Sequence, residues 1–238
     1  MTKPRRAQPL PIRITHWVNV PVLTVMAMSG LQILNAYPMF GPRGEPWRWV
    51  PFGGSLQPFP SWMTAGGWLA GARHLHYALA WLLVANAGVY LVYLVASGEF
   101  RRRWFWPPRD TVPALRQQLY YADAFRFRIA SAIARVRKKP APARKRLPPP
   151  VQLYNGLQRA AYSAAFSLGV IEVLSGLAIW KPVQLHRLAW AMGGYDGARV
   201  VHFLALIALA GFAIVHVVMV CLHWRQLPEI VTGGKPHA

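Results

Sequence analysis

Histidine is the residue type in this chain whose spacing points to chemistry. Three apolar segments each contain an arginine followed three residues later by a histidine: Arg13 with His16, Arg73 with His76, and Arg199 with His202. The last segment also contains His216, about four helical turns and about 21 Å beyond His202 along the axis. That separation is too large for one shared metal ion but suits two stacked cofactors. Two neutral imidazoles on opposite faces of a haem iron leave no open coordination position, which favours electron transfer over oxygen chemistry.

Long apolar segments must position these histidines. Of the 238 residues, 54% are hydrophobic and 14% are charged, which is typical of a protein whose main solvent is the bilayer. A span needs roughly 20 mostly apolar residues, and backbone groups in lipid must be satisfied within the segment, which predicts helices. Four stretches qualify: 14–36, 74–97, 157–180 and 199–223. The sequence therefore predicts an all-α fold, an integral membrane four-helix bundle that forms a single domain over residues 1–238.

The net charge of +20 is distributed by membrane side. Most of the 27 lysines and arginines lie before the first span, between the second and third spans, or after the fourth. The positive-inside rule therefore places both termini and the basic loop 98–156 in the cytoplasm, and the loop 37–73 in the periplasm. This distribution argues against a nucleic-acid-binding protein, which would present basic residues on a folded soluble surface. We expect a multi-pass protein of the bacterial inner membrane.

The predicted topology brings four histidines to two depths. His76 and His202 each begin a span that enters from the outer side, whereas His16 and His216 lie near the cytoplasmic ends of their spans. We therefore expect an outer haem iron between the first two and an inner haem iron between the other two. A single histidine near a helix end is more often an interfacial hydrogen-bonding residue than a ligand. Agreement among four of them favours ligation.

The other charged residues near the spans receive supporting roles. Arg13, Arg73 and Arg199 are well placed to pair with haem propionates. His74 stands two residues from His76 and points about 200° away from it, so only one of the two faces the bundle. A zinc site is poorly supported, because no two histidines combine local spacing with a third ligand. The remaining histidines are expected to be solvated or are given no role: His186, His223 and His237.

Glu172 is the only acidic residue in the core of a predicted span. Ionisable residues inside spans are costly, which makes them candidates for function. Two interpretations stay open. In one, the carboxyl group pairs with a donor near a haem or carries protons, and in the other it is a protonated acid hydrogen-bonded to a neighbouring helix.

The cysteine content limits how a cofactor can be held. Cys221 is the single cysteine, so neither a disulfide framework nor a cysteine-based metal cluster can form within the chain. The chain also lacks a C-x-x-C-H attachment sequence. Any haem must therefore be held by coordination and packing alone.

An internal repeat relates the two halves of the chain. The sequence Ser29-Gly30-Leu31 in the first span matches Ser175-Gly176-Leu177 in the third, and the Arg-x-x-His patterns of the second and fourth spans also match. Under this overlay a tyrosine stands opposite each inner histidine, Tyr162 opposite His16 and Tyr90 opposite His216. Duplication of one helical hairpin is the favoured explanation, and coincidence is the alternative.

The two longer loops differ in composition. Residues Leu115–Arg137 carry apolar side chains at helical intervals among five arginines, which predicts an amphipathic helix resting on anionic lipid. The following run, Lys138–Pro150, is rich in proline and basic residues and predicts an extended linker. The loop 37–73 is rich in tryptophan, which suits a segment at headgroup depth or a docking surface.

These patterns resemble the membrane b-type cytochrome subunits of nickel-iron hydrogenases, formate dehydrogenases (gamma subunit) and thiosulfate reductases. The resemblance spans nearly the whole chain and is carried by Arg13-Ile-Thr-His16-Trp17, Ser29-Gly30, Arg73-His-Leu-His76-Tyr77, Tyr154-Asn155-Gly-Leu-Gln158, Arg199-Val-Val-His202-Phe203 and His216. It implies that the four histidines bind two haems b and that the subunit exchanges electrons with quinone, at a site near the inner haem, while its partner works outside the membrane. The long basic loop and the tryptophan-rich loop look less typical of hydrogenase and formate dehydrogenase anchors, so a molybdenum-type partner or another periplasmic enzyme stays in play.

The sequence thus predicts an electron-transfer subunit of an oxidoreductase complex. It would pass electrons between the membrane quinone pool and a periplasmic catalytic or electron-transfer subunit. The alternative is a stand-alone quinone-linked cytochrome b oxidoreductase that uses a small diffusible donor. A third hypothesis, a haem-free transporter or scaffold, predicts a colourless protein.

Overall fold

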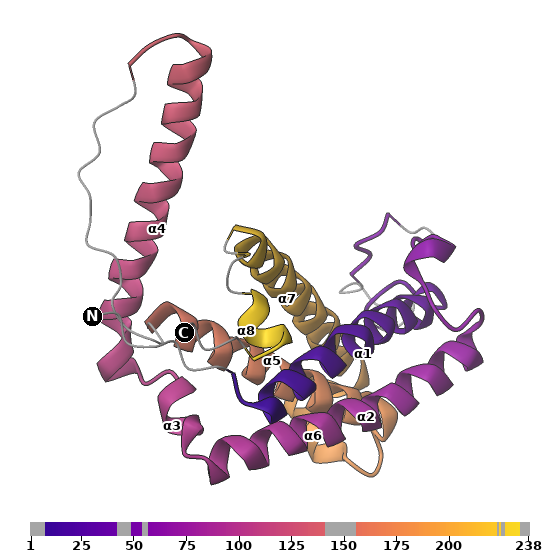
Figure 1. The fold of residues 1–238 in the computed structure, drawn as a ribbon. Coiled ribbons are helices and arrows are strands. Elements are labelled where there is room, and N and C mark those ends of the chain that lie inside the picture. Colours follow the sequence, from indigo (N-terminus) through magenta and orange to yellow (C-terminus); the bar gives the residue numbers. More distant parts are fainter. Residues whose placement is uncertain are drawn as a thin grey trace. The chain divides into compact units, whose positions relative to one another are not determined.

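The computed structural model describes residues 8–41, 49–53, 57–140, 156–222, 224 and 227–233. Within these ranges the regular elements are helices. One isolated β-bridge pairs Phe40 with Trp49. Four helices are long and apolar enough to cross a membrane: α1 (Leu10–Asn35), α2 (Leu69–Ala96), α5 (Gly156–Trp180) and α7 (Gly194–Leu222). The predicted all-α fold with four spans is therefore confirmed (Figure 1).

The span helices begin up to five residues before the predicted spans. Helix α1 starts at Leu10 rather than at residue 14. Pro11 fits its first turn, because the backbone N–H that proline lacks would have no partner within the helix there. Helix α7 starts at Gly194 rather than at residue 199, and Asp196 in its first turn accepts a hydrogen bond from Arg199 at 3.4 Å. Hydropathy marks the apolar centre of a span, whereas polar first turns extend the helix toward the interface.

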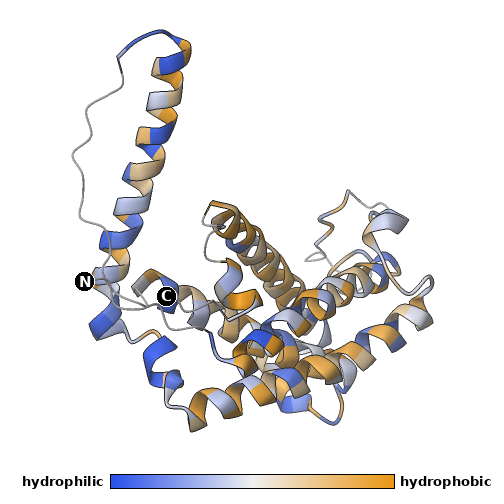
Figure 2. Cartoon of the chain, viewed as in Figure 1, coloured by the Kyte–Doolittle hydropathy of each residue, from blue (hydrophilic) through white to orange (hydrophobic). Residues whose placement is uncertain are grey.

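The burial pattern of the spans is the reverse of that in a water-soluble bundle. Large apolar side chains point outward, including Trp81, Val92 and Ile214, which are 63%, 69% and 66% exposed. The buried positions are small or polar, such as Ala72 and Ser29, both 0% exposed. Helices in lipid pack through small residues while apolar side chains face the hydrocarbon, and this distribution fits that environment. Figure 2 shows α7 as apolar over most of its length.

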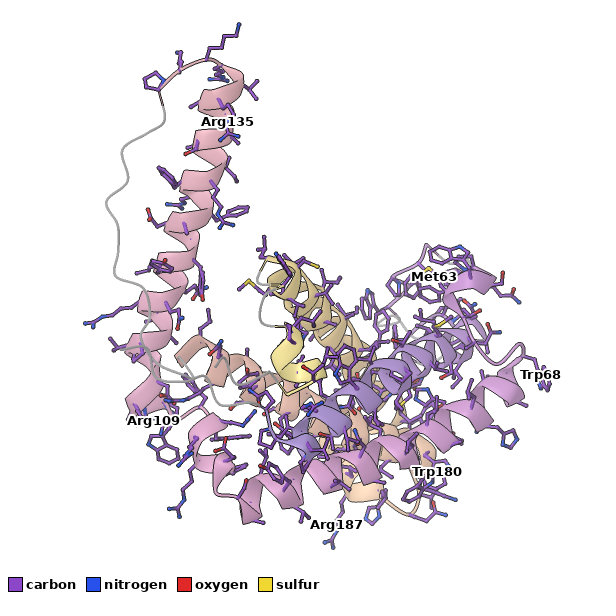
Figure 3. All side chains as sticks on the ribbon, viewed as in Figure 1. Met63, Trp68, Arg109, Arg135, Trp180 and Arg187 are labelled. Atoms are coloured by element: carbon purple, nitrogen blue, oxygen red, sulfur yellow. The ribbon has the colours of Figure 1, made fainter. Side chains whose placement is uncertain are left out.

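The chain forms two compact units, residues 1–96 with 168–238, and residues 97–167. In the first unit α1 packs along α2, and α6 (His186–Ala191) packs against α7 around Ala178, Ala189 and Ala198. The unit also contains α8 (Leu227–Val231). Trp180, at the end of α5 (Figure 3), contacts the Tyr77 ring of α2 at a centroid distance of 5.6 Å. The single-domain organisation of the whole chain stays a prediction.

The segment after α1 packs against the helices of the first unit. The side chain of Asn35 donates to the carbonyl of Phe59 at 2.9 Å and accepts from its amide at 3.1 Å. Phe40, 1% exposed, contacts the rings of Trp49 and Phe203 at centroid distances of 5.1 and 5.0 Å. A short 3-10 helix, η1 (Ser61–Met63), follows. The described part of the predicted loop 37–73 is thus an ordered, aromatic-rich cap on the first unit.

The second unit contains α3 (Glu99–Arg103), α4 (Pro107–Val136) and the first half of α5. The carboxylate of Asp110, 1% exposed, joins the start of α4 to α5: it accepts from the amide of Trp106 at 2.8 Å and from Arg159 of α5 at 2.6 Å. Hydrogen bonds from Arg109, the Trp106 amide and Arg159 hold the pKa of the Asp110 carboxyl well below its usual range. Gly156 is required beside this contact, because a Cβ there would lie 2.6 Å from the carbonyl oxygen of Asp110.

The predicted amphipathic helix Leu115–Arg137 exists and begins earlier, at Pro107. Two prolines occupy its first turn, where their missing donors cost no hydrogen bond. Its apolar face is open, with Leu119 64% and Val136 83% exposed, and its hydropathy alternates along the helix (Figure 2). Arg109 and Arg135 lie at its two ends (Figure 3). Contact of this face with anionic lipid stays a prediction, and residues 141–150 of the predicted linker lie outside the described residues.

Asp110→Asn should lower the free energy of unfolding of the second unit by about 2–3 kcal/mol, because the amide cannot pair with the two arginines. The depressed pKa means that the carboxylate contributes its full stabilisation above the ordinary aspartate range, near pH 4, and loses it only in stronger acid. The measurement is protease-monitored unfolding of purified protein between pH 8 and pH 3. Thr111→Ala, which removes only a hydrogen bond within α4, is the control. Equal resistance of both variants would contradict the prediction.

Candidate functional site

The structure brings the four histidines of the spans together as two pairs. His76 of α2 and His202 of α7 have ring centroids 6.2 Å apart, with 69° between the ring planes. His16 of α1 and His216 of α7 have ring centroids 6.0 Å apart, with 66° between the planes. These are the two pairs that the sequence pattern predicted. Helix α7 contributes one ring to each pair.

The spacing of each pair matches two imidazoles that bind one metal centre from opposite sides. Metal–imidazole bonds are about 2 Å long, and the ring centre lies about 1 Å behind the bonding nitrogen. Two such ligands in line therefore place their ring centroids about 6 Å apart, as both pairs do. The same distances and tilted ring planes also occur in edge-to-face ring contacts, so the identity of the two donors carries the assignment. The donor set thus fits a six-coordinate haem iron at each pair.

Hydrogen bonds determine which nitrogen of His76 is available to a metal. Its Nδ1 lies 3.1 Å from the backbone carbonyl oxygen of Met26 and 3.0 Å from the Ser29 hydroxyl. A carbonyl oxygen can only accept, so Nδ1 carries the proton and donates it. The Nε2 lone pair is therefore free for a metal ion. Fixing the tautomer in this way is the usual role of groups behind a histidine ligand.

His202 is held in the same way, with one difference. Its Nδ1 lies 2.9 Å from the Ser175 hydroxyl and 2.7 Å from Oε2 of Glu172. The Ser175 hydroxyl donates to the carbonyl of Ile171 at 2.6 Å, so it accepts from His202. The acceptor that replaces the backbone carbonyl is thus a carboxyl group. Glu172 is thus hydrogen-bonded to His202 of the neighbouring helix α7, a contact that both interpretations of this residue allow.

The repeated Ser-Gly sequences lie directly over these two histidines. A Cβ on Gly30 would stand 3.5 Å from Cε1 of His76, and a Cβ on Gly176 would stand 3.4 Å from Cε1 of His202. Each serine hydroxyl is hydrogen-bonded to a histidine ring, and each glycine leaves space beside that ring. Helix α1 makes these contacts to His76 of α2, and α5 makes them to His202 of α7. The same contact occurs in both halves, which supports the duplicated-hairpin explanation of the sequence repeat.

In the described part of the chain, aromatic rings contact both histidines of the inner pair. The Phe212 ring is nearly parallel to His216, at 12° and 6.0 Å between centroids, and Trp17 meets His16 edge-on at 5.6 Å. Sequence reasoning missed a polar contact one helical turn away. Asn86 of α2 donates to the carbonyl of Thr15 and to the Asn19 side chain, both at 2.8 Å. An asparagine inside an apolar span was the available signal, since such side chains join helices in lipid.

The arginines of the repeated pattern differ in their surroundings. Arg13 donates to the carbonyl of Val231 in α8, and its buried Nε has no hydrogen-bond partner among the described residues. Arg199 donates to the carbonyl of Tyr37 at 2.9 Å and lies over the Tyr37 and Phe40 rings. Arg73 is exposed. Pairing of these arginines with propionates stays a prediction.

The remaining described histidines take no part in either pair. His74 and His186 are exposed, while His223 and His237 lie outside the described residues. In the part of the chain that the structure describes, no group of three histidine, cysteine or acidic side chains could hold a bare metal ion. The paired imidazoles are therefore the metal-binding candidates of the described fold.

Four apolar spans that enclose paired imidazoles at iron-bridging distance define a membrane bundle of the cytochrome b class. A profile of the prokaryotic cytochrome b561 family matches residues 7–233. The chain belongs to this family. A protein of Azospira oryzae named as a protein-methionine-sulfoxide reductase subunit, YedZ1, is 34% identical over 227 residues, which cover 93% of both chains. No solved structure matches the chain.

Family membership carries the chemistry that the site geometry suggests. Prokaryotic cytochromes b561 bind haem b, and the chain is accordingly a haem-binding electron-transport protein. The four apolar helices make it a multi-pass protein of the bacterial inner membrane. Because these helices carry their large apolar side chains outward, the polar groups that orient the histidines are kept away from lipid.

Gly176→Leu should reduce haem binding, because the larger side chain pushes the His202 ring out of line. Gly176→Ala should bind haem normally, because a Cβ there would make only ordinary contact at 3.4 Å. The measurement is the haem content of purified protein, with the sharpness of the low-spin absorption bands. Gly169→Leu on the same helix, where a Cβ meets nothing within 4 Å, is the matched control. Equal haem content in both leucine variants would show that the glycine does not position His202.

Proposed function

We propose that the chain is a dihaem b-type cytochrome that transfers electrons between the membrane quinone pool and a periplasmic oxidoreductase partner. His76 and His202 hold an outer haem, and His16 and His216 hold an inner haem. The observation that carries this proposal is the occurrence of two imidazole pairs at the spacing of a bridged iron, 6.2 and 6.0 Å between centroids. The bound iron supplies reversible one-electron exchange between its ferric and ferrous states.

The two pairs support a path across the membrane rather than one isolated centre. His202 and His216 lie on the same helix, about 21 Å apart along its axis, so their pairs occupy different depths. Each pair would hold one haem b through two imidazoles, which would supply electron transfer rather than oxygen chemistry. The chain's own work is to hold, orient and insulate two electron carriers.

The similarity to the Azospira oryzae protein favours a reductase as the partner. That relative is named as a subunit of a protein-methionine-sulfoxide reductase. By analogy we propose that electrons flow outward, from quinol to a periplasmic enzyme that reduces oxidised methionine in proteins. A stand-alone oxidoreductase with a diffusible donor is the alternative. Co-purification of a periplasmic reductase subunit with this chain, and loss of quinol-dependent sulfoxide reduction without it, would separate the two.

Purified protein made with ample haem supply should contain two haems b per chain. His202→Ala removes a ligand of the outer site and His216→Ala a ligand of the inner site, so each variant should retain one haem. The measurement is pyridine haemochrome quantification per protein, with reduced-minus-oxidised spectra. His74→Ala, which changes an exposed histidine two residues from His76, should retain both haems. A colourless wild-type preparation, or haem loss from His74→Ala, would overturn the assignment.

The proposed electron path requires both termini and the basic loop on the cytoplasmic side, as the distribution of positive charge predicts. Reporter fusions after Gly53 should be active with alkaline phosphatase and dark with green fluorescent protein. Fusions after Arg137 should behave in the opposite way. The reversed pattern would turn the His76 and His202 pair toward the cytoplasm and remove the basis for a periplasmic partner.

A further inference from the structure

The two imidazoles of the outer pair differ in what accepts their Nδ1 protons. His76 donates to neutral groups, the Met26 carbonyl at 3.1 Å and the Ser29 hydroxyl at 3.0 Å. His202 donates to the Ser175 hydroxyl at 2.9 Å and to Oε2 of Glu172 at 2.7 Å. The second oxygen of Glu172, Oε1, is buried and has no hydrogen-bond partner among the described residues. The carboxyl group is thus committed to the histidine.

The internal repeat shows that this carboxyl group replaces a neutral acceptor. The overlay that matches Ser29 with Ser175 also matches Met26 with Glu172. In the first half, the acceptor is the backbone carbonyl at this position, and in the second half it is the side chain. A carboxyl group inside a span is costly, and His76 is held without one. The difference between the halves is therefore electronic rather than steric.

A carboxylate behind an imidazole ligand changes the electron density at the metal. It draws the Nδ1 proton toward itself, which raises the basicity of Nε2 and strengthens the bond to the metal. A more basic ligand and a nearby negative charge both stabilise ferric over ferrous iron. The neutral acceptors behind His76 have a weaker effect, because hydrogen bonds to charged groups are the stronger ones.

We propose that Glu172 lowers the reduction potential of the outer haem through its hydrogen bond to His202. This inference rests on the proposed outer site between His76 and His202. Glu172 is a positioning and tuning residue, since it contacts the ligand and not the iron. Its effect makes the outer haem a stronger reductant than the same site with two neutral acceptors, which suits a centre that passes electrons out of the membrane.

The test is a spectroelectrochemical titration of the purified full chain, compared with Glu172→Gln. Glutamine keeps the size and an acceptor oxygen but removes the charge. One haem should shift to higher potential, by about a tenfold change in its ferric-to-ferrous ratio at fixed potential, or about 59 mV for one electron. The inner haem of the same molecule should not move and serves as the internal control. Glu172→Asp, which keeps the charge, should stay closer to the wild type.

A second variant gives a change of opposite sign. Met26→Glu places a carboxyl group at the repeat-equivalent position beside His76, so it should lower the potential of the same haem. If Glu172→Gln loses the haem, the Met26→Glu titration decides: an unchanged or raised potential overturns the inference. Two bound haems with no shift in Glu172→Gln would refute the role of Glu172 alone. Absence of two haems from the wild type would instead refute the proposed function.

Discussion

An imidazole inside a membrane has two nitrogens, and each needs a partner because lipid offers none. This constraint organises the first unit of the fold. At His76 and His202 the Nδ1 protons are taken by groups on the neighbouring helix, so the Nε2 lone pairs are left for a metal ion, and the two ring centroids lie 6.2 Å apart. The acceptors are local to helices α1 and α5, where each serine hydroxyl also donates to a carbonyl of its own helix. The same hydrogen bonds therefore hold the helices of each pair together and fix the orientation of the histidine rings.

The four spans contribute unequally to the two histidine pairs. Helix α7 carries a ring of each pair, α1 and α2 carry one ring each, and α5 carries no histidine but orients His202. The outer pair comes from repeat-equivalent positions of α2 and α7. The inner pair does not, since tyrosines stand at the positions equivalent to His16 and His216. A duplicated hairpin therefore explains the outer site directly, while the inner site depends on what distinguishes the halves.

The spans were predictable from hydropathy along the sequence, and the histidine pairs were predictable from the position of each histidine within its span. Hydropathy located the apolar centres, and the depth of each histidine followed from its distance to a span end. The partners behind the rings were not predictable. The Glu172 contact with His202 and the Arg13 contact with Val231 depend on the rotation of helices about their axes and on where a short terminal helix folds back. The joining of α4 and α5 by Asp110 was missed for the same reason, since Arg159 is 49 residues away in the sequence.

The asymmetry between Met26 and Glu172 follows from how a repeat can diverge in lipid. A backbone carbonyl is present whatever the side chain, so position 26 can satisfy His76 with an apolar residue. Position 172 takes a costlier side chain although the carbonyls of its helix remain available, and one of them already accepts from Ser175. Satisfying the hydrogen bond alone does not require an acid there. A negative charge beside the histidine ligand changes the balance between the two oxidation states of the metal more strongly than a neutral carbonyl does. The proposed change in that balance gives a physical reason for an acid in the span that carries no histidine.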